Sequence, residues 1–487
     1  MRQVSFPGAS STCTQPCATG AYRVALLTAV VAIFVFCAGL KATASAPATN
    51  VTPSSGPPTT TTLVSGNGFD PNAHIEIYFD TSDLISSTTN SSGAFSNIAL
   101  QVPSSAVPGS HWITVLERPA KMARASFLVR TDWAQNGFDN TKASNNPYEN
   151  VLSPANVGRL ALRWSYHASQ EWVASPTVAL GTVFAGFYGG SLYALNAADG
   201  TLGWVNPDDV LQSSPAVSNG VVYVDDGSLC ALNAATGTSL WCSSVGYQGG
   251  DLPAGPTVAN GMVYVGSNDG RFRAFNANTG ALVWVYDTGG YIYSSAAVVN
   301  GIVYFGSWDD NLYALNANTG TLIWKFAANN YINASPAVVN GVVYFTSWDG
   351  NAYALDAGTG ALLWSYGFAA PYGGLVSSVA VANGMVYVSG QNLHFVYALD
   401  ARTGSLLWRF ANANPVAGLS SPSVANGVLY VGSLDGNIFA VNASTGAPLW
   451  SHNLGGHVWS APTVVNGMLF TGSDMNGMFY AFGLPSN

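Results

Sequence analysis

A twelve-residue string, YALNANTGTLIW at residues 313–324, is repeated with small changes through the chain, and this repetition constrains the fold more than any other feature. The shared frame is A-x-[ND]-A-x-[TD]-G-x-x-x-W, and its seven copies begin at residues 193, 230, 273, 313, 353, 397 and 439. In each copy the Asn or Asp side chain can bond its own backbone two residues on, and the glycine can take a positive φ, so the chain reverses. The tryptophan then supplies a large apolar surface. Each copy is therefore predicted to be a hairpin tip followed by a packing anchor.

A second frame fills the space between the copies, as in SPAVVNGVVYFTSWDGN at residues 335–351. Its Val/Tyr alternation has the period of two that is typical of strands, and Asn-Gly is a strong hairpin signal. The Asn-Gly pair recurs at 219, 260, 300, 340, 383, 426 and 466, while the first copy has Leu180-Gly181 instead. Each unit of about 40 residues thus predicts a meander of four strands, A to D, which is the blade of a β-propeller.

The number of units predicts how the ring closes. Tryptophans end strand D at eight positions, namely Trp164, Trp204, Trp241, Trp284, Trp324, Trp364, Trp408 and Trp450. The A-B-C triplets begin near residues 175, 214, 255, 295, 335, 377, 421 and 461. Trp164 has no triplet before it, and the last triplet has no tryptophan after it. We therefore predict an all-β, eight-bladed propeller in which an N-terminal strand completes the last blade and removes the open edges. An open β-solenoid is the alternative, and the complementary chain ends argue against it.

The remaining sequence divides into four segments before the propeller, which we place at residues 160–484. Residues 63–131 alternate strand-like runs with Gly/Asn/Pro turns and predict a small immunoglobulin-like β-sandwich. The Thr/Pro/Ser-rich residues 47–62 are interpreted as a flexible linker. Residues 132–159 form a lead-in to the propeller, and residues 1–46 are a targeting segment.

The targeting segment has the features of an export signal. Arg2 and Arg23 precede an apolar run from Val24 to Leu40, and small residues follow before Pro47. The run of 17 residues is long for a cleaved signal, so an uncleaved transmembrane anchor is the second interpretation. Both interpretations place the rest of the chain outside the cytoplasm, either secreted or held at the cell surface.

Charge and cysteine usage fit an exported protein. The formal net charge is −9, and no Lys/Arg cluster follows residue 46, which argues against nucleic acid as a partner. Beyond the targeting segment the only cysteines are Cys230 and Cys242, on predicted strands C and D of one hairpin. If Ala231 faces Trp241, the two cysteines face each other, so we predict a cross-strand disulfide; a free pair is the alternative.

The repeat frame resembles the tryptophan-docking motif of PQQ-type propellers, the architecture of quinoprotein dehydrogenases and of the bacterial outer-membrane assembly lipoprotein. The segment DWAQNGFDNTKASNNPYENVLSPANVGRLALRW at residues 132–164 resembles the lead-in of such propellers. The resemblance covers about two thirds of the chain and implies the fold. It implies much less about chemistry, because one fold hosts many functions.

The loop sequences indicate which face of the disc carries a site. The A-B and C-D turns are uniform Asn-Gly and Thr-Gly, whereas aromatic residues gather in the B-C turns and D-A connections of the other face. An aromatic-walled site with a few polar groups is typical of ligand binding. The candidate residues are Trp172, Tyr188, Tyr291, Tyr293, Trp308, Asp309, Tyr331, Asn333, Trp348, Asp349, His457 and Trp459.

Each candidate has a structural alternative. WDDN and WDGN are good turn sequences, so Asp309 and Asp349 are interpreted as hairpin formers rather than metal ligands. Trp308 and Trp348 occupy matching places in consecutive blades, which fits either an interaction surface or rim packing. The six histidines are scattered without zinc-like spacing, and no metal site is predicted.

The leading prediction is an exported, non-catalytic propeller that binds a protein or an extracellular polymer through its aromatic face, with no cofactor. The alternative is a quinoprotein dehydrogenase acting on alcohols or sugars with PQQ and calcium. Known members hold these groups with a catalytic aspartate and, in many cases, two adjacent cysteines; Cys230 and Cys242 are not adjacent, and no acidic cluster matches the calcium ligands. No catalytic residue is therefore assigned.

Overall fold

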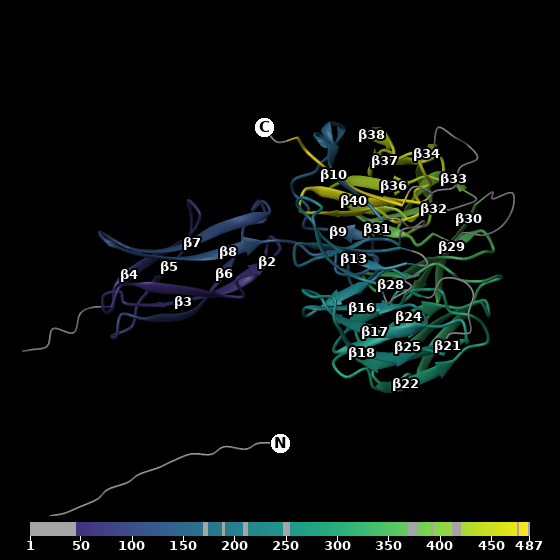
Figure 1. Ribbon diagram of the computed structural model, residues 1–487, viewed down its shortest axis with the longest axis horizontal. Helices are drawn as coiled ribbons and strands as arrows, with labels where there is room; N and C mark the ends of the chain where they lie inside the picture. Colours follow the sequence, from purple (N-terminus) through teal and green to yellow (C-terminus); the bar gives the residue numbers. More distant parts are fainter. Residues whose placement is uncertain are drawn as a thin grey trace, which may run out of the picture. The chain divides into compact units, whose positions relative to one another are not determined.

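The computed structural model describes residues 45–168, 174–187, 190–207, 213–246, 254–368, 377–390, 393–411, 420–474 and 477–485 (Figure 1). Within these residues the regular elements are strands, apart from the short 3-10 helix η1 (Val157–Arg159). No helix in this part of the chain is long and apolar enough to cross a membrane. The all-β prediction is confirmed, and nearly all of the predicted targeting segment lies outside the described residues.

The N-terminal strands form a two-layer sandwich. One sheet has the order β1 (Ala48–Thr52), β3 (Thr61–Asn67), β6 (Phe95–Gln101). The other has the order β2 (Ser55–Gly56), β8 (Lys121–Val129), β7 (Gly109–Glu117), β4 (His74–Phe79), β5 (Ser82–Thr88). Val64, Leu100, Ile77 and Phe127 come from both sheets and lie in a single buried core. Alternate side chains of each strand thus point into the space between the layers.

The interpretation of residues 47–62 as a flexible linker is wrong. Strand β1 pairs antiparallel with β3 from Ala48 to Thr52, and β2 pairs parallel with β8. Threonine and valine are β-branched and favour strands, so a Thr-rich segment next to a sheet edge can join it. Val51 packs against the sandwich core and supplies the apolar contact that a linker lacks.

Eight four-stranded antiparallel units follow in the described residues, and we number them blades 1 to 8. Blades 1 and 2 are β11 (Thr177–Ala179), β12 (Thr182–Gly186), β13 (Leu192–Asn196), β14 (Leu202–Asn206) and β15 (Ala216–Ser218), β16 (Val221–Asp225), β17 (Ser228–Asn233), β18 (Ser239–Ser244). Blades 3 and 4 are β19 (Thr257–Ala259), β20 (Met262–Gly266), β21 (Arg271–Asn276), β22 (Leu282–Asp287) and β23 (Ala297–Val299), β24 (Ile302–Gly306), β25 (Asn311–Asn316), β26 (Leu322–Ala327). Blades 5 and 6 are β27 (Ala337–Val339), β28 (Val342–Thr346), β29 (Asn351–Asp356), β30 (Leu362–Gly367) and β31 (Ala380–Ala382), β32 (Met385–Gly390), β33 (Leu393–Asp400), β34 (Leu406–Ala411). Blade 7 is β35 (Ser423–Ala425), β36 (Val428–Gly432), β37 (Asn437–Asn442), β38 (Pro448–Asn453), and β9 (Asn145–Asn146) extends it.

Blade 8 joins the two ends of the propeller. Its strands are β39 (Thr463–Val465), β40 (Met468–Ser473), β41 (Met478–Gly483) and β10 (Ala161–His167). Strand β10 pairs antiparallel with β41, with Trp164 opposite Ala481, and Figure 1 shows the blue β10 among the yellow strands of the chain's end. The N-terminal strand therefore completes the last blade, as the offset between tryptophans and triplets predicts.

The repeat frame builds a socket for the tryptophan of the preceding blade. The indole Nε1 of Trp284 donates a hydrogen bond to the carbonyl oxygen of Ala317 at 3.0 Å, and Trp324 does the same to Ala357 at 3.0 Å. Gly320 has a φ of 71°, close to the 70° and 73° of Gly280 and Gly360 in the neighbouring copies, and it lies directly against the Trp284 ring. The indole hydrogen bond recurs in the other six blade interfaces, where each tryptophan donates to a backbone carbonyl oxygen of the next blade. These tryptophans are Trp164, Trp204, Trp241, Trp364, Trp408 and Trp450. Seven of these eight acceptor carbonyls belong to the seven frame copies, and the eighth is that of Leu160, just before β10.

The lead-in runs around the inside of the ring as a strap, which we define as residues 133–146. The strap forms hydrogen bonds with the innermost strand of successive blades. In blade 1 the backbones of Trp133 and Val178 pair with each other. In blades 2, 4, 5, 6 and 7 strap carbonyls accept from valine amides, and the pairs are Ala134 with Val217, Asn140 with Val298, Thr141 with Val338, Ala143 with Val381 and Ser144 with Val424. The Gln135 side chain reaches Val258 N, and Asn146 Nδ2 donates to Val464 O at 2.9 Å. Innermost strands otherwise present unpaired backbone groups, so the strap satisfies at least one group in each blade.

The strap lies on the side of the A-B turns. A cavity of about 360 Å³ is lined both by strap residues such as Thr141 and Ala143 and by Asn300 and Asn340 of those turns. Further along the lead-in, Asn426 Nδ2 donates to Leu152 O at 2.8 Å. The uniform Asn-Gly turns are therefore the docking side for this chain's own lead-in.

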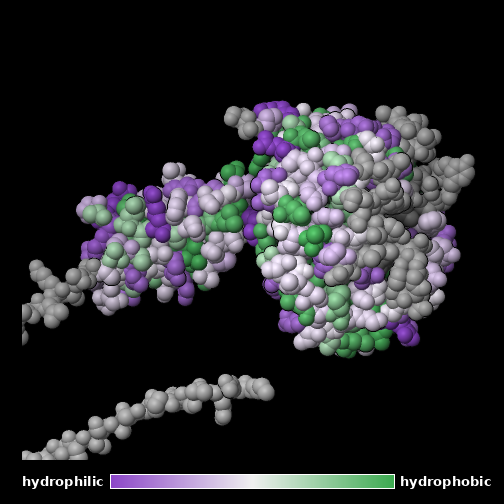
Figure 2. Space-filling model, viewed as in Figure 1, coloured by the Kyte–Doolittle hydropathy of each residue, from purple (hydrophilic) through white to green (hydrophobic). Residues whose placement is uncertain are grey.

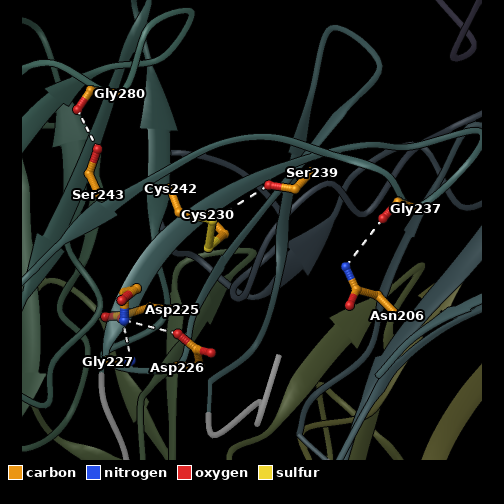
Figure 3. The surroundings of a disulfide bond; sticks show 11 residues. Asn206, Asp225, Asp226, Gly227, Cys230, Gly237, Ser239, Cys242, Ser243 and Gly280 are labelled. Atoms are coloured by element: carbon orange, nitrogen blue, oxygen red, sulfur yellow. Dashed lines mark hydrogen bonds between the residues drawn. A yellow bond between two sulfur atoms is a disulfide. The ribbon is translucent and has the colours of Figure 1, made fainter. Parts of the chain in front are cut away.

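The structure contains the Cys230–Cys242 disulfide (Figure 3). The two residues are directly opposite in the register of β17 and β18, with Cα atoms 4.1 Å apart, and Ala231 is opposite Trp241. The bridge therefore staples the outer hairpin of blade 2, away from the loops that carry the aromatic candidates.

Candidate functional site

Two pairs of loops bring most of the aromatic candidates together, one pair in blade 4 and one in blade 5. In blade 4 the connection before β23 is clipped to the β24–β25 turn, because Trp308 N donates to Tyr291 O at 2.9 Å and Gly289 N donates to Asp309 Oδ2 at 2.9 Å. In blade 5 Trp348 N donates to Tyr331 O at 2.9 Å. The repeat therefore sets the same loop geometry twice, side by side.

Five rings from these loops form a continuous surface, which we call the aromatic ladder: Tyr293, Tyr291, Trp308, Tyr331 and Trp348. The rings of Trp308 and Tyr331 stack across the blade interface with centroids 4.7 Å apart and planes 6° apart. Tyr291 and Tyr293 pack on Trp308 at 5.5 Å and 5.2 Å, and Tyr331 lies 6.4 Å from Trp348. These are the separations of attractive aromatic pairs, so the rings hold one another in place.

The ladder has a buried side and an open side. Trp308 is partly buried, and its indole N–H donates to Asn333 Oδ1, which fixes the orientation of the ring. Tyr291 and Tyr331 are 48% and 39% exposed. Both interpretations of these loops therefore hold in part. Trp308 and Trp348 are packing residues, whereas Tyr291 and Tyr331 are exposed to solvent.

The aspartates beside the ladder shape the turns. Asp309 Oδ1 accepts from Asn311 N at 3.2 Å, and Asp349 Oδ1 accepts from Asn351 N at 3.0 Å. Each carboxylate also accepts the hydroxyl of a tyrosine on strand C, Tyr313 or Tyr353. Burial favours the neutral form of Asp309, but the hydrogen bonds from Tyr313, Gly289 and Asn311 outweigh burial and hold its pKa below the usual range.

The other predicted residues lie elsewhere. His457 and Trp459 are on the connection before β39 in blade 8, at the loop position that Tyr291 and Tyr293 occupy in blade 4. There Asp474 N donates to His457 O at 2.9 Å, and the His457 ring lies 3.5 Å from the Asp474 carboxylate. Blade 8 thus repeats the loop geometry, with His457 and Asp474 at the places of Tyr291 and Trp308 and with Trp459 at the place of Tyr293. Trp172 and Tyr188 lie outside the described residues.

The structure buries two ionisable residues, Asp225 and Lys142, that the sequence did not mark as candidates. Asp225 ends β16 where β12, β20, β24 and β36 end in glycine, and burial raises its pKa to about 7. Lys142 of the strap donates to Asn136 O at 2.9 Å, and burial lowers its pKa to about 7. Comparing the copies position by position would have found Asp225, whereas Lys142 lies outside the repeats and no pattern marks it.

The described residues do not fit the PQQ and calcium of a quinoprotein dehydrogenase. Calcium takes six to eight oxygen ligands, usually with several carboxylates. In the described part of the chain no group of three or more His, Cys, Asp or Glu side chains gathers at one place. Cys230 and Cys242 are joined in an outer hairpin rather than as neighbours along the chain. We therefore derive no oxidation step.

The comparisons with known proteins agree with the fold. The PQQ_2 family model, described as outer membrane protein assembly factor BamB, matches residues 158–211, 190–297, 289–395 and 392–482. Outer membrane protein assembly factor BamB of Moranella endobia (strain PCIT) is 29% identical over 147 residues, which is 27% of this chain. The match spans 38% of the length of that relative.

Solved structures show the same architecture at low identity. BamB from Moraxella catarrhalis has a TM-score of 0.57 at 22% identity, covering 67% of this chain and 98% of that one. Quinohemoprotein alcohol dehydrogenase from Comamonas testosteroni has a TM-score of 0.63 at 18% identity, covering 73% and 81%. A europium-containing methanol dehydrogenase has a TM-score of 0.60 at 17% identity, covering 73% and 98%. At these identities the likeness establishes the propeller fold alone, so activity depends on the residues of the site.

Proposed function

The chain belongs to the PQQ_2 family, described as outer membrane protein assembly factor BamB, and from this we propose that it is a non-catalytic β-propeller that binds a protein partner outside the cytoplasm. The export signal that the sequence predicts in residues 1–46 supports the compartment. The relatives whose names refer to assembly support a protein, rather than a small molecule, as what is bound.

The aromatic ladder is the observation that carries this proposal. Aromatic residues with rigid, partly packed rings are enriched at the energetic centres of protein interfaces. Tyr291 and Tyr331 expose 48% and 39% of their surface while Trp308 holds them from behind. Each tyrosine has few rotamers left to lose, so binding costs little side-chain entropy.

Exposed apolar residues also occur on the outer strands, and they do not form a comparable site. Figure 2 shows an apolar patch at the lower edge of the view, where Figure 1 places β22, and Leu282 and Val283 of that strand are about half exposed. These aliphatic side chains repeat in the same place on neighbouring outer strands, as Leu322 and Ile323 do on β26. They serve as matched controls, because they are equally apolar and exposed but lack the rings.

The test compares two double variants as bait in pull-downs from the native cell envelope. Tyr291→Ala with Tyr331→Ala removes the open rings, and Leu322→Ala with Ile323→Ala removes a similar apolar surface from the rim. We expect the tyrosine variant to lose capture of a defined protein by at least about 30-fold, since that is the effect of a single interface hot spot of about 2 kcal/mol. The rim variant should capture as wild type does.

Thermal unfolding of both variants serves as the folding control. Trp308 and Trp348 are less suitable targets, because Trp308 is packed between Tyr293, Tyr291 and Tyr331 and its removal would disturb the loops. Equal capture by the wild type and a folded tyrosine variant would overturn the proposal.

A further inference from the structure

The ladder lies among acidic residues and has no basic ones on its own loops. The loops of blades 4 and 5 that build it are residues 288–296, 307–311, 328–336 and 347–351, and they contain Asp309, Asp310 and Asp349 but no Lys, Arg or His. A one-signed field beside aromatic rings selects for partners of the opposite charge.

The carboxylates of the ladder loops are bonded by neutral groups. Asp309 accepts from two backbone amides and the Tyr313 hydroxyl, and Asp349 accepts from the amides of Asn351 and Asn329 and from the Tyr353 hydroxyl. Neutral donors stabilise the charge without cancelling it. The two aspartates are in none of the ion pairs found among the described residues.

Three basic side chains on strands β21 and β26 have their contacts outside the ladder rings. Arg271 pairs with Asp287 at 2.6 Å, and Arg273 pairs with Asp269. Lys325, on β26, has its ammonium 5.9 Å from the ring centroid of Tyr313 rather than over a ladder ring. The negative charge beside the ladder is therefore left for a ligand to balance.

We propose, building on the proposed function, that the ladder recognises an arginine-bearing segment of the protein partner. A guanidinium is planar and weakly hydrated and stacks on Tyr and Trp faces, where the negative face of the ring attracts it. The open rings of Tyr291 and Tyr331 supply such faces, and the nearby carboxylates add a longer-range attraction. A neutral sugar could stack on the rings but would gain nothing from this charge.

The test uses a short Gly/Ser peptide with two spaced arginines, and the same peptide with lysine, citrulline or glutamate in their place. Citrulline keeps the shape and planarity of arginine and lacks its charge. Binding to the full-length protein is followed by tryptophan fluorescence and by calorimetry. We expect the arginine peptide to bind about tenfold more tightly than the citrulline peptide at low salt. That ratio should fall toward one as salt rises to 0.5 M, where the Debye length is only a few ångströms.

Two matched charge variants locate the effect. Asp310→Asn removes one charge at the ladder and keeps a residue that tolerates its φ of 68°. Asp199→Asn makes the same change in a C-D turn of the other face, where Asp199 Oδ1 accepts from Thr201 N at 3.0 Å. We expect Asp310→Asn to weaken arginine-peptide binding about threefold and Asp199→Asn to leave it unchanged.

Equal binding of the arginine and citrulline peptides would overturn the inference, as would arginine binding that survives Tyr291→Ala with Tyr331→Ala. Tyrosine-dependent binding of a neutral glucan oligosaccharide in place of the arginine peptide would also overturn it and would identify a polymer ligand. The proposed function is tested separately by the capture experiment with the cell envelope. If capture depends on the ladder but the arginine peptide binds no better than the citrulline peptide, this inference is rejected and the proposed function stands.

Discussion

Gly320 is the position where one added methyl group tests the packing between blades. It lies in the frame of blade 4 at φ 71°, and a Cβ built there would be 2.6 Å from Cε3 and 2.7 Å from Cδ2 of Trp284. No real Cβ makes such contacts with a ring. Trp284 cannot withdraw easily, because it is 8% exposed and its Nε1 donates to Ala317 O at 3.0 Å.

Gly320→Ala therefore combines two costs. A left-handed conformation costs an alanine about 1–2 kcal/mol, and forcing extra volume into a packed interface costs about 1–3 kcal/mol more. The expected loss in the free energy of unfolding is thus about 2–5 kcal/mol. Gly341→Ala is the matched control, because Gly341 has φ 79° but no atom within 4 Å of an added Cβ. It should lose only the conformational part, about 1–2 kcal/mol.

Urea unfolding followed by tryptophan fluorescence and far-UV circular dichroism measures both variants. The difference between them isolates the contact with Trp284, and a double-mutant cycle with Trp284→Ala should remove that difference. Equal losses in Gly320→Ala and Gly341→Ala would refute the socket, because the ring would then not lie where the repeat frame places it.

Two further changes test other parts of the fold. Replacing Cys230 and Cys242 with serine should lower the free energy of unfolding by about 3 kcal/mol, because the disulfide closes a short loop with a sequence separation of 12. Reducing the disulfide of the wild type should cause the same loss. An unchanged free energy of unfolding in the serine variant would contradict the disulfide. Lys142 has its pKa lowered by burial from 10.5 to about 7, so between these values the unfolded chain holds a proton that the folded protein lacks, and stability should rise from pH 7 to pH 9. Lys142→Met should flatten that rise, and an unchanged slope would contradict the buried position of the amine.

Most of the propeller could be predicted because its signals are local and repeated. Asn300-Gly301 and Asn340-Gly341 specify turns by the φ each residue tolerates, and Trp164 without a preceding triplet specifies closure. The disulfide followed from register alone, since Ala231 opposite Trp241 forces Cys230 opposite Cys242. In each case the information lies within a hairpin or in counting copies.

The strap and the sandwich edge depend on contacts between distant segments, and a single sequence does not encode these in a readable pattern. Asn140 and Thr141 contribute only backbone carbonyls to Val298 and Val338, so their side chains give no sign of the bonds. Strand β1 lies in a segment whose polar composition predicts a linker, although its pairing with β3 decides its structure.

The sequence predicts which residues lie on the candidate face, but it does not predict which of their side chains pack and which are exposed. The sequence places Trp308 and Tyr331 on loops of the same face, yet it does not show that their rings stack while Tyr291 stays open. That distinction comes from the side-chain packing across the interface between blades 4 and 5. It also explains why His457 and Trp459, at an equivalent loop position in blade 8, lie outside the ladder.

A photo-crosslinker in the native cell envelope tests the ladder as a binding surface most directly. Benzoylphenylalanine at Tyr331 keeps an aromatic ring at the open position, and the same residue at Ile323 on β26 gives an equally exposed control on the rim, the two sites being 39% and 44% exposed. We expect position 331 to crosslink to one defined protein, which Tyr291→Ala weakens, and position 323 not to crosslink to it. The same protein crosslinked equally from both positions, or from position 323 alone, would contradict the assignment of the aromatic ladder as the binding site.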